Sequence, residues 1–295
     1  MSEYQSYTWQ TLDRPLTTEE RAAVDKLSSH IEVSFTGAWV EYEWGDFKHD
    51  PIQVLARYFD AFQYFANWGA ERLAFRFPKH LLGAERLQPY LWTECADLQT
   101  IGDYYILHFS APETDEPPEW EGESPGLDEL SPLRTDILQG DLRSLYLASL
   151  LGIVAGVFPD DDEGNDALAE LEPPIPPGLG QLTSALAAFI RFMHIDPFLV
   201  RAAAEASAPL AAPPTTDLVT AIAQLPRAEC DGFLQRLLQG EANLQVMLRR
   251  RLEELTGDKE QATPEAPRRT IGELLERAGQ LRRAAATRAP RQQRR

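Results

Sequence analysis

The positions of apolar and polar residues divide the chain into two parts with different periods. Up to residue 110, short segments alternate apolar and polar side chains, which is typical of half-buried strands. Beyond residue 127, apolar residues recur every three or four positions, which predicts amphipathic helices. We therefore predict an α+β fold in which a sheet domain precedes an all-helical domain.

The stretch 44–78 holds the best-defined local pattern. Asp50 followed by Pro51 predicts a helix start, because aspartate caps free N–H groups and proline fits the first helical position. Apolar residues at helical spacing extend the predicted helix to Ala66, and Gly69 is placed to end it. An alternating strand then completes the stretch.

The predicted order of elements through this stretch is strand, helix, strand, strand, helix, strand. That is the order of the split βαβ, or ferredoxin-like, motif, so we predict such a sheet domain over residues 1–110. A further hairpin is predicted from two short alternating segments joined by Gly102-Asp103.

Composition marks the boundaries of the predicted domains. Residues 111–127 are acidic and rich in proline and glycine, which predicts a linker. Helical periodicity follows over 128–256. Residues 257–295 are predicted to form a second linker and a basic helical tail, since 263–295 contain three acids and nine arginines in a chain of net charge −18.

Charge and cysteine content exclude several classes of protein. A net charge of −18 disfavours binding of nucleic acid or anionic membrane by the bulk of the chain. Cys95 and Cys230 are far apart and form no disulfide framework, which indicates a reducing compartment. Without a secretory signal or an apolar run long enough to span a bilayer, we expect a cytoplasmic protein with no membrane partner.

The loop before the predicted helix gathers Trp44, Asp46, Lys48, His49 and Asp50. Its carboxylates and imidazole are groups that ligate metals or transfer protons. The structural interpretation is favoured, because Asp50 is explained as an N-cap and no second histidine lies at the spacing of a helical zinc site. Trp44, Asp46, Lys48 and His49 remain candidate binding residues, and we predict no metal site and no cofactor.

No catalytic constellation can be recognised, so catalytic residues stay unassigned. The histidines are scattered, and no glycine-rich phosphate-binding loop occurs in the required context. The acidic loop 160–166 resembles a calcium-binding loop, but Asp166 stands where such a loop requires glycine. A solvated loop between helices is therefore favoured there.

The basic C-terminal helix is the most suggestive feature of the chain. An apolar stripe lies at helical spacing beside the arginines Arg277, Arg282, Arg283 and Arg288. Such a helix suits an acidic partner surface, a nucleic-acid backbone or the acidic body of the same chain. We predict a protein partner, with self-docking left open, and expect nucleic acid to be bound only through this tail.

Four short motifs give the chain a resemblance. They are W-G-D-F-K at 44–48, A-N-W-G at 66–69, L-E-P-P-I-P-P-G-L at 171–179 and I-D-P at 195–197. With them, most of residues 1–240 resembles a family of functionally uncharacterised bacterial proteins. The resemblance implies a bacterial, cytoplasmic protein and assigns no functional residue.

These observations favour a non-enzymatic protein–protein interaction or adaptor protein over an enzyme. The favoured docking element is the arginine-rich C-terminal helix. The alternative is an enzyme with an interdomain pocket that uses acids such as Asp46 and Asp50. A weaker alternative is a nucleic-acid accessory factor that acts through the basic tail.

Overall fold

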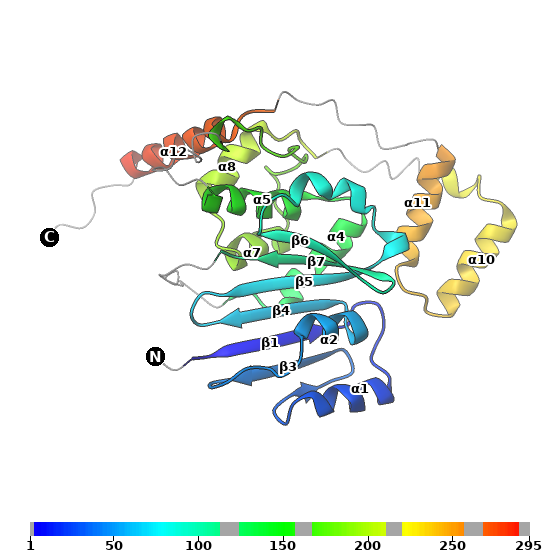
Figure 1. Ribbon diagram of the computed structural model, residues 1–295. Coiled ribbons are helices and arrows are strands. Elements are labelled where there is room, and N and C mark those ends of the chain that lie inside the picture. Colours follow the sequence, from blue (N-terminus) through cyan, green and yellow to red (C-terminus); the bar gives the residue numbers. More distant parts are fainter. Residues whose placement is uncertain (1–2, 113–123, 157–166, 211–219, 257–267, 289–295) are drawn as a thin grey trace.

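The computed structural model describes residues 3–112, 124–156, 167–210, 220–256 and 268–288. Their strands form a seven-stranded antiparallel sheet in the order β2-β3-β1-β4-β5-β7-β6, and most of the helices follow the sheet in sequence (Figure 1). The predicted α+β class is confirmed.

The strands and helices have the following bounds. The strands are β1 (Gln5–Gln10), β2 (Glu32–Val33), β3 (Gly37–Tyr42), β4 (Ala61–Ala66), β5 (Glu71–Pro78), β6 (Ala96–Ile101) and β7 (Tyr104–Ser110). The helices are α1 (Thr18–Val24), α2 (Pro51–Tyr58), α3 (Leu127–Leu130), α4 (Pro132–Leu138), α5 (Arg143–Gly156), α7 (Ser184–Phe192), α8 (Pro197–Ala206), α10 (Arg227–Leu238), α11 (Leu244–Thr256) and α12 (Ile271–Arg288).

The split-βαβ arrangement is not confirmed. That motif places parallel strands side by side, whereas each strand pair among the described residues is antiparallel. The helix predicted to reach Ala66 ends at Tyr58, and 61–66 form strand β4 instead. Several consecutive β4 residues are buried on both faces, which hides the period of two. Gly69 (φ 92°) turns the chain between β4 and β5.

The local start signals are confirmed. The Asp50 side chain accepts a hydrogen bond from the backbone N–H of Ile52 at 2.8 Å, with Pro51 at the first helical position. Thr17 and Glu20 form a capping box at the start of α1. These contacts are local, so the sequence alone predicts them.

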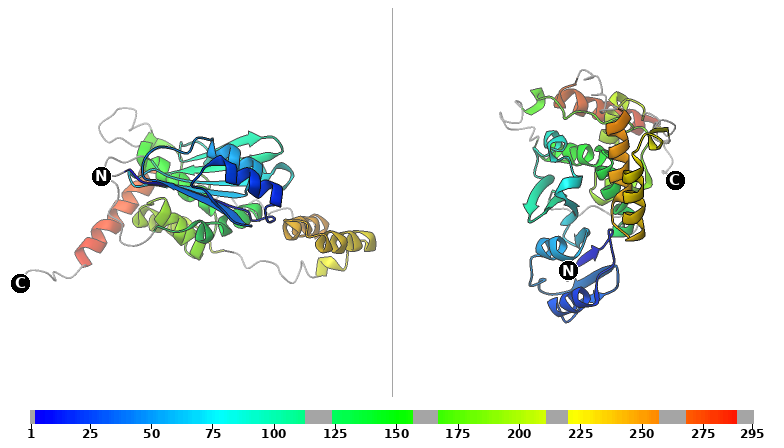
Figure 2. Two further views of the ribbon diagram at one scale, coloured as in Figure 1. Left: turned by 90° about the horizontal axis from the view of Figure 1, so that it is seen from below. Right: turned by 90° about the vertical axis from the view of Figure 1, so that its right-hand side faces the viewer.

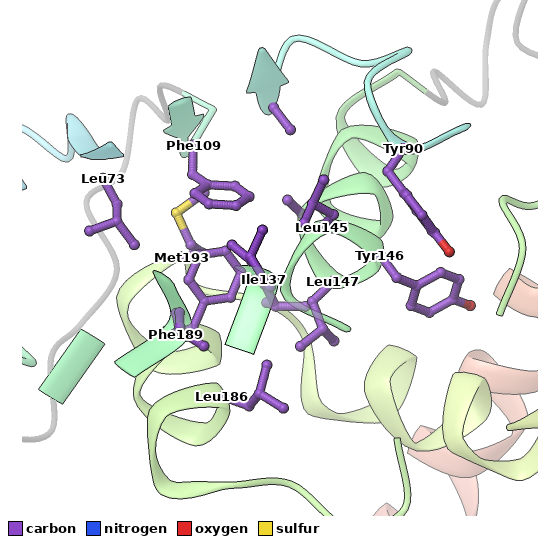
Figure 3. Packing of buried hydrophobic residues seen from close by; sticks show 14 of the residues in the cluster. Leu73, Tyr90, Phe109, Ile137, Leu145, Tyr146, Leu147, Leu186, Phe189 and Met193 are labelled. Atoms are coloured by element: carbon purple, nitrogen blue, oxygen red, sulfur yellow. The ribbon is translucent and has the colours of Figure 1, made fainter. Parts of the chain in front are cut away.

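The sheet is covered on both faces (Figure 2). Helices α1 and α2 pack on one face around Trp9, Val40 and Phe62. On the other face, side chains of β5 and β7 share one apolar cluster with α3, α4, α5, α7 and α8. Figure 3 shows Phe109 of β7 beside Phe189 of α7, and their ring centroids are 5.1 Å apart. The predicted domain boundaries stay a prediction.

A buried ion network ties α4 to the sheet. Arg134 donates to both carboxylate oxygens of Asp13 at 2.8 and 2.9 Å, and Arg76 donates to Asp60 at 2.7 Å. Burial alone would raise the pKa of Asp60, but Arg134 and Arg76 hold it below its usual value. The network therefore keeps charged groups paired at the boundary between sheet and helices.

No single helix among the described residues is long and apolar enough to cross a membrane. Two consecutive helical segments, 127–138 and 143–155, are together long and apolar enough to span a membrane, by length and composition only, but they are bent relative to each other. Many of their apolar side chains lie in the core.

Candidate functional site

The predicted loop site is mostly exposed. Trp44 has 71% of its surface exposed, and Lys48 and His49 are exposed as well. The His49 ring lies against Phe47, with 5.6 Å between ring centroids. None of these loop residues lines any of the four cavities found among the described residues.

The two loop acids have structural partners. Asp46 accepts a hydrogen bond from the Gln5 side-chain amide at 2.9 Å, which ties the loop to β1. Asp50 caps α2 through the N–H groups of Ile52 and Gln53. Neither acid lines one of the four cavities described. The structure therefore does not bring these acids together in a pocket, and their role in binding stays a prediction.

The apolar stripe of the predicted docking helix is covered by the same chain. Ile271, Leu274 and Ala278 of α12 are buried in the cluster that includes α8. Arg283 is exposed, and the side chain of Arg288 lies outside the described residues. A partner for this helix would have to use its remaining surface and stays a prediction.

Two of the predicted docking arginines bind acids of the chain itself. Arg277 donates to Glu205 at 2.6 and 2.9 Å. Arg282 pairs with Asp196, the residue that caps α8. The basic helix therefore rests on an acidic edge of its own body, which corresponds to the self-docking alternative.

A cavity of about 680 Å³ lies where three elements meet at one end of the sheet. It is lined by the start of β5, the end of β7, the loop 92–95 and the second half of α5. This volume lies within the usual range of small-molecule sites. The cavity lies between the sheet and α5, and neither Asp46 nor Asp50 lines it.

Glu71 is the most unusual residue of the cavity wall. It is only 1% exposed, although it is an acid. Its Oε2 lies 2.9 Å from Nε2 of His194, whereas Oε1 is buried and has no hydrogen-bond partner among the described residues. Burial raises the pKa of Glu71, and His194 opposes that shift. A buried carboxylate oxygen without a partner is costly unless a ligand or water satisfies it.

Two further buried polar atoms belong to residues that line the same cavity. Nε2 of His108 and Oγ1 of Thr93 have no hydrogen-bond partner among the described residues. Burial, with Arg72 nearby, lowers the pKa of His108, so this imidazole is neutral at neutral pH. A neutral imidazole has one donor and one acceptor nitrogen. The cavity therefore offers hydrogen-bonding groups that the protein leaves unused.

Gly152 of α5 lets the loop 92–95 approach the helix closely. A Cβ atom built at position 152 would lie 2.3 Å from Cβ of Thr93. Because Thr93 is held against the helix backbone, its hydroxyl has a fixed place in the cavity wall. Any side chain at position 152 would displace the loop.

Cys95 also lines the cavity, but it is not poised as a nucleophile. Burial is the main cause that raises the pKa of this thiol, to about 11. Since the thiolate is the reactive form, Cys95 stays an unreactive thiol at neutral pH. The cavity wall is therefore better suited to binding than to covalent chemistry.

Both acidic and basic side chains line the cavity. Glu71 and Arg72 are neighbours on β5, so their side chains leave opposite faces of the strand. Glu94 and the half-exposed ring of Trp92 complete the opening. Among the described residues, no group of three or more His, Cys, Asp or Glu side chains could hold a metal ion.

The sequence contains one signal for this site. In the strand 71–78, every second residue from Leu73 to Phe77 is apolar, and Glu71 lies two residues before Leu73, on the same side of the strand. An acid in the buried phase of a strand indicates a partner or a ligand. His108 and Thr93 carry no such signal, because their burial depends on β7 and α5 being adjacent to them.

Comparison with known proteins gives no relative for this arrangement. No protein-family model, no curated protein and no solved structure matches the chain.

Proposed function

We propose that the protein binds a small zwitterion, a molecule with an ammonium and a carboxylate group such as a free amino acid, in the cavity beside Glu71. The observation that carries the proposal is the buried Oε1 of Glu71, which lines the cavity without a partner among the described residues. A ligand donor at this position would replace the missing hydrogen bond.

An ammonium group fits the acidic side of the cavity. It has three N–H donors, and the Glu71 carboxylate and the Thr93 hydroxyl are acceptors with free capacity. A charge-assisted bond to a buried carboxylate is stronger than a neutral one, which favours an amine over an alcohol.

The other side of the cavity suits the carboxylate of the ligand. Arg72 is exposed and lines the opening, with its guanidinium 5.7 Å from the Tyr64 ring centroid, and its planar fork of donors matches a carboxylate. Trp92 and the small residues Ala111 and Ala155 supply apolar surface between the charged groups. A ligand that bound both groups would extend from Glu71 around the end of β5 to the exposed Arg72, which favours a molecule with both charges.

The proposal is tested by thermal unfolding of the full chain with each of the twenty free L-amino acids. We expect at least one to raise the Tm of the wild type by roughly 2–5 °C at concentrations well above its Kd. Glu71→Gln should abolish most of that rise, because it removes the charge and keeps the shape. Glu85→Gln, an exposed acid outside this cavity, is the matched control and should respond like the wild type.

Two results would overturn the proposal. One is the absence of any rise in wild-type Tm with all twenty amino acids. The other is an equal affinity of the Glu71→Gln variant, measured by isothermal titration with the amino acid that gave the rise. Circular dichroism of the unliganded variant shows whether it is folded before this comparison is made.

A further inference from the structure

The α10–α11 hairpin, residues 227–256, carries an apolar face that no other described part of the chain covers. Leu234, Leu237 and Leu238 are 57%, 62% and 89% exposed, and α10 has no buried residue. Their spacing of three and four places them on one side of the helix, which we call the leucine face. Removing leucine side chains from water is favourable, so a contact that covered this face would be stabilised.

The position of the hairpin leaves the leucine face accessible. In Figures 1 and 2 the hairpin projects from one end of the molecule, opposite the end that carries α12. A small cluster of Ala221, Leu225 and Leu252 holds the hairpin together. The face is therefore presented by a folded unit with its own apolar contacts.

The charge of the hairpin differs from that of the rest of the chain. Its five acids are balanced by five arginines: Glu229, Asp231, Glu241, Glu253 and Glu254 against Arg227, Arg236, Arg249, Arg250 and Arg251. The whole chain has a net charge of −18. Two copies that met through most other surfaces would repel each other, whereas two neutral hairpins can approach.

We propose that the leucine face binds the same face of a second copy of this chain, with the two α10 helices antiparallel. A twofold contact of this kind is self-complementary. It brings Arg227, at the start of α10, beside Glu241 of the partner subunit, just beyond the end of its helix. Because a contact between single helices is small, the dimer is weak, with a Kd on the order of micromolar.

The test is sedimentation velocity of the full chain over a series of concentrations from nanomolar to high micromolar. We expect the wild type to change from monomer to dimer. Leu234→Gln with Leu237→Gln should weaken the dimer by at least about tenfold. Leu171→Gln alters a leucine of similar exposure far from the hairpin and should leave the dimer unchanged. A wild type that stays monomeric, or a dimer that survives both leucine changes, would overturn the proposal.

A charge exchange at low salt tests the antiparallel orientation. Within the chain Arg227 pairs with Asp231 and Glu241 pairs with Arg236, so circular dichroism first checks that each variant is folded. Arg227→Glu should weaken the dimer, since it places two acids together. Adding Glu241→Arg should restore the dimer. If the second change restores nothing, the antiparallel arrangement is wrong. This arm does not alter the leucines, so loss of apolar surface cannot explain its outcome.

Discussion

The C-terminal helix α12 and the α10–α11 hairpin are both amphipathic helical segments, yet the fold treats them differently. The apolar stripe of α12 is buried against α8 and its neighbours. The leucines of α10 remain exposed. From the sequence, the basic helix was the expected docking element, whereas the hairpin was one predicted helical pair among several.

The difference arises from what lies beside each apolar stripe. Next to α12, Arg269 donates to Glu172 at 2.6 Å, and Glu172 is fully buried. The Tyr146 hydroxyl also donates to that carboxylate, at 2.7 Å. Among the described residues, the hairpin is tied to the body by the bond from Asn243 to Asp13 and by bonds from Arg250 to the carbonyls of His80 and Leu81, and none of these involves a buried carboxylate. An amphipathic pattern thus shows that a helix has an apolar side, while the surrounding contacts decide whether that side is covered.

The largest effect is expected where α12 is anchored. Arg269→Ala should lower the free energy of unfolding by about 3–5 kcal/mol, because it leaves the buried Glu172 carboxylate without its cation. Hydrogen exchange should also become faster in α12. Chemical denaturation and exchange mass spectrometry measure the two effects.

The matched control removes the negative charge of Glu172 as well as the arginine. Arg269→Ala combined with Glu172→Gln should lose less stability than Arg269→Ala alone, since no unpaired charge remains buried. Equal losses would show that the ion pair is not what anchors the helix, and the contrast with the hairpin would then rest on apolar packing alone.

A smaller effect is expected at the attachment of the hairpin. Asn243 has a positive φ of 59° and donates to Asp13 at 2.9 Å. Asn243→Gly tolerates that backbone angle and loses the hydrogen bond, so we expect a loss of about 1 kcal/mol. Asn243→Ala should lose more, because alanine adds backbone strain. A loss as large as that of Arg269→Ala would mean that the hairpin is as firmly anchored as α12.

The smallest effect is expected at the exposed arginine of α12. Arg282 pairs with Asp196, but its side chain is 60% exposed. Arg282→Gln should therefore change stability by no more than about 1 kcal/mol, and less at high salt. Thermal unfolding at low and high salt measures this change. A large, salt-independent loss would show that exposed ion pairs contribute to docking as strongly as the buried one.

The sequence by itself determined the local structure of this protein. The N-cap at Asp50 begins a helix as predicted, because a cap is satisfied by backbone groups two or three residues away. The named elements over the described part of 128–256 are helices, and Gly102 turns the chain between β6 and β7 as predicted. Each of these features depends on neighbours in sequence.

The tertiary structure decided what depends on distant neighbours. Residues 61–66 are a strand because β1 and β5 lie on either side of them, although their spacing also fits a helix. The candidate site depends on β5, β7 and α5 meeting at one end of the sheet, which places Glu71, Thr93 and His108 around one cavity. Burial leaves Oε1 of Glu71, Oγ1 of Thr93 and Nε2 of His108 without a hydrogen-bond partner among the described residues. The strand pattern marks Glu71 alone, whereas the burial of Thr93 and His108 depends on side chains from other parts of the chain.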